Sequence, residues 1–337
     1  MKTRILMATL PLAVVLVAIA IFIYWAGSPV ETPARWAAVY QYPDCEFKQD
    51  VSKTMKIMTF NIGYFSGMSN NLPVREDQYF FSMNMAAFHE YLAGNPVDIA
   101  AFQEIDFKSH RSYRIDQLDH IARKNGFPMT ARVVNWDKRY VPFPYWPPSV
   151  NFGPMLSGQG LASRFEISSN HRVQLKDPDG MFFIKKMFYM KRLAQVSRVK
   201  VGEKDLIVVN VHLEAFNRET RRQQARQVLE LCREFQSSQP LILLGDFNCV
   251  PPDAPKKTGF MDEPDTDYRG EDTIQLFLNE KWLESALTGQ PTFPANQPDR
   301  QLDYIFYTPR WISRTSAYTV NLNSSDHLPV VMEFVLL

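Results

Sequence analysis

Residues 241–248 read LILLGDFN, and this stretch decides how the chain folds. Four apolar residues run without a spacer into Gly245 and the polar side chains of Asp246 and Asn248. A short apolar run bounded by a turn signal predicts a buried strand. A carboxylate at the end of such a strand is costly to bury unless it is paired or bound to a metal. The stretch therefore predicts a core strand with a functional group at its end.

Similar apolar runs recur along the chain and alternate with helical patterns. Apolar residues recur at helical spacing over residues 76–92, 111–125 and 218–235. Strands are predicted at residues 56–60, 98–102, 160–163, 193–201, 206–213, 241–246, 302–307 and 329–335. Strands that are apolar at their centres and have helices between them predict an α/β fold in which helices cover sheets.

Polar side chains stand at the ends of most of these strands. The set comprises Asn61, Gln103, Glu104, His212, Asp246, Asn248, Asp303, Asp326 and His327. Six separate stretches that each place such a group near one rim predict one shared site. Carboxylate and amide oxygens suit Mg²⁺ or Mn²⁺, and no Cys/His cluster with zinc spacing is present in the sequence.

Each of these residues also has an ordinary structural interpretation. An Asp-Phe-Asn stretch after a strand is often only a turn, because Asp and Asn bond to their own backbone. Asp326 fits a helix cap or a loop acid, and a lone His212 is more often a satisfied core residue than a catalyst. The functional interpretation depends on the joint occurrence of all these residues in this order.

That order resembles the endonuclease/exonuclease/phosphatase superfamily of metal-dependent phosphoesterases, which includes sphingomyelinase-like and apurinic-endonuclease-like members. The resemblance covers about residues 55–337. It is carried by the stretches TFN (59–61), QE (103–104), VHL (211–213), GDFN (245–248), LDYI (302–305) and SDH (325–327). It implies a four-layered α/β sandwich, with two mixed β-sheets face to face and helices outside. It also implies hydrolysis of a phosphoester bond with Mg²⁺, or Mn²⁺, as cofactor.

The resemblance also implies roles for individual residues. Glu104 is expected to be the principal metal ligand, and Asn61 and Asp326 are expected to complete or approach the same metal shell. The residues expected to act on water and phosphate are His212, Asp246, Asn248, Asp303 and His327. Among these, Asp246 and Asn248 orient the attacking water and hold a phosphate oxygen, and Asp303 orients His327 toward the phosphate. His212 is expected to assist on the side of the leaving group or to donate to the phosphate.

Two assignments stay open at this stage. The general base is either Asp246 or the Asp303–His327 pair. No residue between Gly126 and Leu206 receives a role, although some nuclease members of the superfamily use further residues from the corresponding region.

The N-terminus differs from the rest of the chain. Lys2 and Arg4 precede an uncharged apolar run from Ile5 to Trp25, which is long enough for a membrane span. We expect residues 1–27 to be an uncleaved signal anchor, with a cleaved signal peptide as the alternative. Residues 28–54 are then a linker, and residues 55–337 are a catalytic domain on the extracytoplasmic side of a single-pass membrane protein, whose N-terminus is cytoplasmic.

Charge and aromatic content bear on the substrate. The chain has 37 basic and 36 acidic residues, so without Lys2 and Arg4 the remainder has 35 and 36, a net charge of −1. Such a body lacks the general basic field that nonspecific nucleic-acid binding requires. Residues 141–156 and 181–192 are loops rich in aromatic residues, and the second also has four cations. Exposed, these loops suit a lipid headgroup boundary; the alternative is that they pack on the protein's own surface. We therefore expect a lipid phosphoester as substrate, with an extracytoplasmic nuclease and a non-catalytic membrane scaffold as alternatives.

Overall fold

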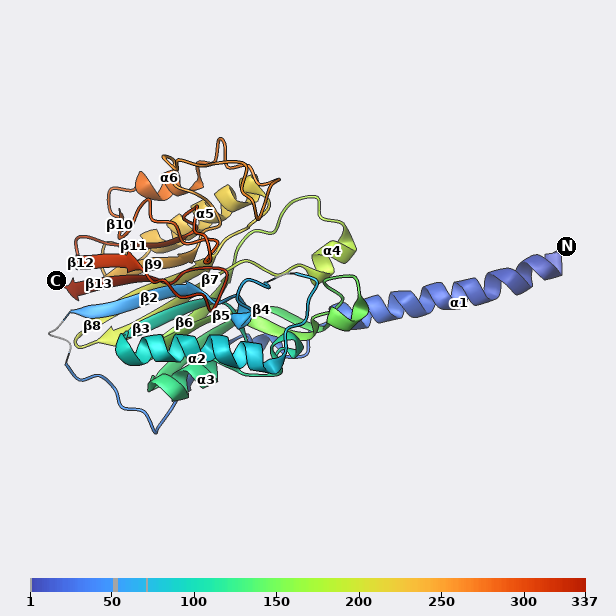
Figure 1. Ribbon diagram of the computed structural model, residues 1–337, viewed down its shortest axis with the longest axis horizontal. Coiled ribbons are helices and arrows are strands. Elements are labelled where there is room, and N and C mark those ends of the chain that lie inside the picture. Colours follow the sequence, from blue (N-terminus) through green and yellow to red (C-terminus); the bar gives the residue numbers. More distant parts are fainter. Residues whose placement is uncertain (1, 51–53, 71) are drawn as a thin grey trace.

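The computed structural model describes residues 2–50, 54–70 and 72–337, with side chains from residue 11 onward. Two mixed β-sheets form the centre of the molecule (Figure 1). The first has the order β1-β4-β5-β3-β2-β13-β12. Its strands are β1 (Ala37–Gln41), β2 (Met55–Asn61), β3 (Ile99–Asp106), β4 (Met129–Val141), β5 (Gly153–Ser163), β12 (Ile312–Thr319) and β13 (Val330–Leu336).

The second sheet has the order β10-β11-β9-β8-β7-β6. Its strands are β6 (Glu166–Gln174), β7 (Leu193–Val201), β8 (Lys204–His212), β9 (Leu241–Asp246), β10 (Glu284–Ser285) and β11 (Asp303–Tyr307). The pairs β2–β3 and β8–β9 are parallel, and the other pairs are antiparallel. The predicted pair of mixed sheets is therefore confirmed.

Three apolar cores hold the layers together. Ile57 and Ile99 of the first sheet and Leu244 of the second belong to the core between the sheets. Successive residues of a strand point to opposite faces, so Met58 faces outward and packs in a core with Phe88 of the helical layer. The outer face of the second sheet packs in the same way on the helix that contains Val228. The order of layers is helix, sheet, sheet, helix, as predicted.

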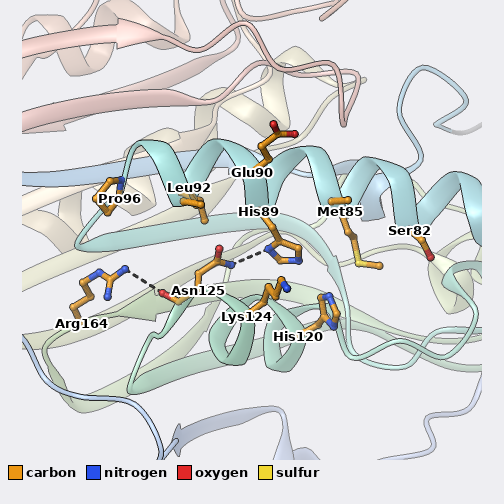
Figure 2. Close-up of a pocket in the computed structure, with 12 residues that line it drawn as sticks. Ser82, Met85, His89, Glu90, Leu92, Pro96, His120, Lys124, Asn125 and Arg164 are labelled. Atoms are coloured by element: carbon orange, nitrogen blue, oxygen red, sulfur yellow. Dashed lines mark hydrogen bonds between the residues drawn. The ribbon is translucent and has the colours of Figure 1, made fainter.

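The covering helices are α2 (Gln78–Gly94) and α3 (Gln117–Asn125) on the first sheet, and α5 (Arg218–Arg233) and α6 (Thr273–Leu278) on the second. Figures 1 and 2 show α2 and α3 side by side. The helix predicted from residue 111 begins at residue 117, because Tyr113 and Arg114 have left-handed backbone angles and Asp116 caps the helix by accepting from the Asp119 amide.

Several elements were not predicted from the sequence. Strands β4, β6 and β12 carry many polar residues, which hid their pattern. Residues 153–156, predicted as part of a loop, begin β5, and residues 183–188 form the short helix α4 (Phe183–Phe188). Residues 37–41, in the predicted linker, form β1 and pair with β4. Residues 51–53 of that linker lie outside the described residues.

The N-terminal segment forms the helix α1 (Lys2–Gly27), which projects from the sandwich in Figure 1. Within the described part of the chain, none of the helices has the length and apolar character that crossing a bilayer requires. The prediction of a transmembrane helix is therefore wrong. The last turn of α1 instead packs against the domain. Ala26 is buried there, and Lys138 donates to the Gly27 carbonyl at 2.8 Å. Localisation of residues 28–337 outside the cytoplasm stays a prediction.

Candidate active site

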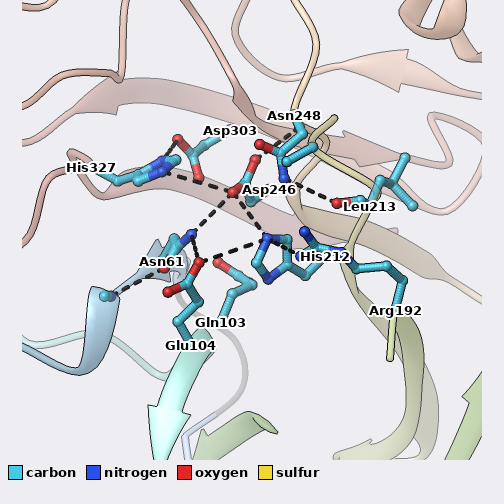
Figure 3. Close-up of polar contacts among 12 residues, drawn as sticks. Asn61, Gln103, Glu104, Arg192, His212, Leu213, Asp246, Asn248, Asp303 and His327 are labelled. Atoms are coloured by element: carbon cyan, nitrogen blue, oxygen red, sulfur yellow. Dashed lines mark hydrogen bonds and ion pairs between the residues drawn. The ribbon is translucent and has the colours of Figure 1, made fainter. Parts of the chain in front are cut away.

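Strand pairing brings the predicted polar residues to one edge of the sandwich. Asn61 is the register partner of Gln103 across β2 and β3, so Glu104 follows immediately beside Asn61. In the second sheet Asp246 is the partner of His212 on one side and of Asp303 on the other. The two sheets face each other, and their strand ends converge in Figure 3. Residues that are far apart in the sequence thus meet because their strands end at the same rim.

Unusual backbone angles occur at this rim. Glu104 has φ +50° and lies at an irregularity in the β3–β5 pairing, and Asn248 has φ +52°. Such left-handed angles cost about 1 kcal/mol or more for residues other than glycine and tend to occur at functional sites. Gly245 has φ +140°, and a Cβ there would lie 1.9 Å from the Val211 carbonyl oxygen. Glycine is therefore required for β9 to approach β8 just before Asp246.

Asp246 lies at the centre of the cluster and is 1% exposed. Its Oδ1 accepts from the backbone N–H of Asn248 at 2.8 Å, and its Oδ2 accepts from Nδ2 of Asn61 at 3.0 Å. The same Oδ2 lies 3.5 Å from Nε2 of His212 and 3.8 Å from Nε2 of His327. Burial raises the pKa of Asp246 to about 7, although the charge of His327 opposes the rise. Asp246 can therefore exchange a proton near neutral pH.

Asp303 and His327 form a buried pair. Nδ1 of His327 lies 2.8 Å from Oδ2 of Asp303, and the ring of Phe293 packs on the imidazole with centroids 4.7 Å apart. Burial alone would lower the pKa of His327, but the charges of Asp303 and Asp246 raise it to about 10. His327 is therefore an imidazolium at neutral pH and offers two N–H donors, as a group that binds phosphate would.

Glu104 and Asp326 form an acidic pair on the other side of Asn61. Nδ2 of Asn70 bridges them, at 3.5 Å from Oε2 of Glu104 and 3.0 Å from Oδ2 of Asp326. Burial raises the pKa of Asp326, the charge of His327 opposes the rise, and the charge of Glu104 adds to it. Among the described residues, no lysine or arginine pairs with either carboxylate. Two close carboxylates that pair with neither lysine nor arginine fit a divalent metal ion.

Asn61 presents its amide nitrogen to this cluster and not its oxygen. Its Nδ2 donates to Glu104 at 3.4 Å, while its Oδ1 accepts from the backbone N–H of Gly63 at 3.1 Å. Since a metal binds an amide through oxygen, Glu104 and Asp326 are better placed as ligands than Asn61 in this arrangement. A second candidate ligand set, formed by Asp246, Asp303 and His327, has ligand atoms within 4.8 Å of one another. Asp303 and His327 already bond to each other at 2.8 Å, so we favour the Glu104–Asp326 pair.

The residues of β8 and of the loop after β9 complete the cluster. His212 is buried, and its Nε2 lies 3.9 Å from Oε1 of Glu104. Burial holds the pKa of His212 well below its usual value, and the Arg192 cation lowers it further. Nδ2 of Asn248 donates to the Leu213 carbonyl at 3.0 Å, which fixes the turn after Asp246. All eight residues predicted for the site therefore lie in one connected region.

Four residues near the cluster were missed by the sequence analysis. Nη1 of Arg192 donates to Nε2 of His212 at 2.6 Å, and its Nε lies 3.7 Å from Oε2 of buried Glu214, which also accepts from the Tyr189 hydroxyl. Asn70, described above, is the fourth. Arg192 and Tyr189 lie in a stretch with several cations and aromatics, which looked like surface. Glu214 is two residues after His212, and that spacing was the one available signal.

A polar layer between the sheets supports the site from below. Nε2 of Gln103 donates to Oδ1 of Asn210 at 2.6 Å, and Nδ2 of Asn210 donates to the Phe102 carbonyl at 3.1 Å. These bonds join β3 of the first sheet to β8 of the second. Gln103 thus holds the two halves of the site in register through its bond to Asn210.

The comparisons with known proteins agree with this geometry. The model of the Endonuclease/Exonuclease/phosphatase family matches residues 58–327, which is most of the chain. The chain belongs to this family. Its members are hydrolases of phosphoester bonds and generally depend on a divalent metal. Family membership therefore supports an enzyme over the alternative of a non-catalytic scaffold. No curated protein matches the chain in sequence.

Solved structures of the family share the fold at low sequence identity. An endonuclease/exonuclease/phosphatase from Beutenbergia cavernae is 21% identical, with a TM-score of 0.60, over 84% of this chain and 72% of that one. The catalytic domain of human nocturnin is 17% identical, with a TM-score of 0.55, over 91% and 100%. A mannosyl-6-phosphatase from Bacteroides thetaiotaomicron is 15% identical, with a TM-score of 0.56, over 83% and 99%. These similarities extend to the fold alone.

Proposed function

We propose that the chain is a Mg²⁺-dependent hydrolase of a phosphoester in a lipid headgroup. The observation that carries the hydrolytic part is the position of Asp246. Its Oδ2 faces Asn61, His212 and His327 at 3.0, 3.5 and 3.8 Å, between an acidic pair and a cationic histidine. A phosphoester repels the attacking water oxygen, so both proton removal and charge neutralisation are needed there.

The roles of the protein groups follow from their protonation. Asp246 acts as general base, because its pKa near 7 lets it take a proton from water. His327 holds its proton at neutral pH and therefore donates to a phosphoryl oxygen, with Asp303 fixing the ring. Glu104 and Asp326 hold the metal, which when bound neutralises charge on the phosphoryl oxygens. Neutral His212, backed by Arg192, assists at the leaving group, and Asn248 positions the substrate.

The lipid part of the proposal is supported by exposed aromatic residues on two adjoining loops. Tyr145 and Trp146 lie on the β4–β5 loop, and Phe182 and Phe183 lie at α4; each is at least 61% exposed. Trp136 connects the loops, because its Nε1 donates to the Phe188 carbonyl and its ring packs near Phe152. Exposed aromatics beside Lys185 and Lys186 suit the boundary between acyl chains and phosphate headgroups.

The loop that contains α4 also reaches the active site. The hydroxyl of Tyr189, just after α4, donates to Glu214, whose other partner Arg192 contacts His212. A headgroup held against the α4 surface would therefore lie near the residues that act on its phosphate. This continuity supports a lipid substrate over a free sugar phosphate.

A substrate panel tests the proposal with the full-length protein. Vesicles of sphingomyelin or glycerophospholipids, sugar monophosphates, a nitrophenyl phosphodiester and plasmid DNA are each incubated with Mg²⁺ and with a chelator. We expect Mg²⁺-dependent release of headgroup phosphate from vesicles, and none from the Asp246→Asn protein. Cleavage of DNA or sugar phosphate with inert vesicles would overturn the lipid part. Inertness toward every phosphoester with Mg²⁺ or Mn²⁺ would overturn the whole proposal.

A further inference from the structure

A pocket of about 650 Å³ lies between α2 and α3, on the outer face of the first sheet and away from the active-site residues (Figure 2). Its apolar lining comes mainly from one face of α2, where Met85 and Leu92 stand on either side of His89. Figure 2 shows His120, Lys124 and Asn125 of α3 opposite this face. Apolar walls with a few polar groups, in a volume of this size, are typical of small-ligand sites.

His89 supplies an unused hydrogen-bond donor in this pocket. The residue is 7% exposed, and its Nε2 has no partner among the described residues. Nδ2 of Asn125 lies 2.9 Å from Nδ1 of His89 and also donates to the Ile121 carbonyl at 2.8 Å, which fixes the orientation of the amide. Nδ1 of the ring therefore accepts, and Nε2 carries the proton. A buried donor left without an acceptor is destabilising.

A lysine cation and a second imidazole lie near His89. The ring of His120 lies 5.0 Å from that of His89, and both His120 and Lys124 lower the pKa of His89, after burial as the main cause, to about 4. The one acid on the pocket lining, Glu90, points away from α3 in Figure 2. A donor without a partner beside the Lys124 cation can bind a negative group, and the flanking apolar residues can contact a hydrocarbon chain.

We propose that the α2–α3 pocket binds an amphiphilic organic anion, with its carboxylate on Nε2 of His89 between His120 and Lys124 and its chain along Met85 and Leu92. The site is separate from the hydrolytic cluster and does not depend on the function proposed above. A bound anion would satisfy the His89 donor and pair with the nearby Lys124 cation.

Binding of octanoate to the full-length protein tests the proposal. Calorimetry compares octanoate with acetate, which lacks the chain, and with 1-octanol, which lacks the charge. We expect octanoate to bind at least about tenfold more tightly than either, since each lacks one of the two interactions. In His89→Phe, which keeps a ring of similar size without the donor, octanoate affinity should fall by about tenfold or more.

Two further measurements make the result decisive. His171→Phe, at an exposed histidine on β6, is the matched control and should bind octanoate as the unaltered protein does. In the unaltered protein, octanoate should shift the ring resonances of His89, which tests the site even if His89→Phe does not fold. Absence of octanoate binding at millimolar concentration, unchanged binding by a folded His89→Phe protein, or equal binding of 1-octanol would each overturn the proposal.

Discussion

The two halves of the active site differ in how their acids are balanced. In the half from β9, β11 and the segment before β13, Asp303 lies 2.8 Å from His327, whose charge also acts on Asp246. In the half from β3 and the same segment, Glu104 and Asp326 both accept from the amide of Asn70. One half contains a direct carboxylate–imidazole pair, and in the other neither carboxylate pairs with a lysine or arginine among the described residues.

This difference indicates a division of work between the halves. A carboxylate balanced by an imidazolium can hold or move a proton, while two unbalanced carboxylates can bind a divalent cation. Asn61 lies between the halves and donates to Asp246 and Glu104 alike. The predictions below test whether the halves act separately in this way.

The largest effect on turnover is expected in the half that contains Asp246, Asp303 and His327. Asp246→Asn and His327→Ala should each lower kcat by about 10³-fold or more, because one removes the base and the other the phosphate donor. Steady-state turnover measures the effect, and thermal unfolding shows whether the fold is kept. Asp265→Asn, at an exposed loop acid, is the control. Near-normal turnover in either variant would remove that residue from the mechanism.

In the half that contains Glu104 and Asp326, a substitution should change the Mg²⁺ concentration that the enzyme requires. Glu104→Gln should lower activity by about 10²–10³-fold and raise the Mg²⁺ concentration needed for half activation, since one ligand charge is lost. His327→Ala should leave that concentration nearly unchanged. If the Mg²⁺ response of Glu104→Gln matched that of the unaltered protein, the proposed division between the halves would be wrong.

Arg192, the residue just before β7, tests the cation that contacts His212. Arg192→Lys keeps a positive charge near Glu214 but loses the planar fork that reaches His212. It should lower kcat/KM by about 10–100-fold without changing the Mg²⁺ response. Arg198→Lys, on the same segment and paired with Asp205, should be nearly silent. An equal loss in both variants would indicate a general effect on β7.

Asn70 tests the bridge within the acidic half. Asn70→Ala removes the amide between Glu104 and Asp326 but no charge. It should raise the Mg²⁺ concentration for half activation by about 10-fold, the lower end of what outer residues contribute to metal affinity. At saturating Mg²⁺, kcat should recover. A loss of kcat that excess Mg²⁺ does not restore would assign Asn70 to substrate contact instead.

The smallest expected effect is on the pH dependence of stability. It concerns His89, which has no carboxylate partner, whereas His327 has several. The folded-state pKa of His89 is about 4, below its value of 6.5 in the unfolded chain, so the unfolded state binds more protons between these values. The stabilising contribution is complete above pH 6.5 and is lost as pH falls through 4. In urea unfolding, acidification should lower the free energy of unfolding by about 2 kcal/mol more in the unaltered protein than in His89→Phe. Equal losses would contradict the low pKa.

The sequence was sufficient where function and fold share a pattern. Asp246 and His212 end apolar strands, so their strands and their proximity could be inferred together. Asn70 follows a short turn with no periodic pattern, and Arg192 stands among lysines and aromatics, so neither could be distinguished from surface residues. Strands with many polar residues, such as β4, lack a strong alternation of apolar and polar residues, so they were not predicted. The transmembrane prediction failed because an apolar run does not show which of its residues pack on the domain.

The segment before β2 has a practical consequence for shortened forms of the protein. The amides of Val30 and Glu31 donate to Asp137 at 2.8 Å, and β1 covers the edge of β4. A truncation that begins at Met55 would strip this cover and leave a long strand with open backbone groups. Uncovered edges pair with other chains, so such a fragment should aggregate, whereas one that begins before Ser28 should remain dispersed.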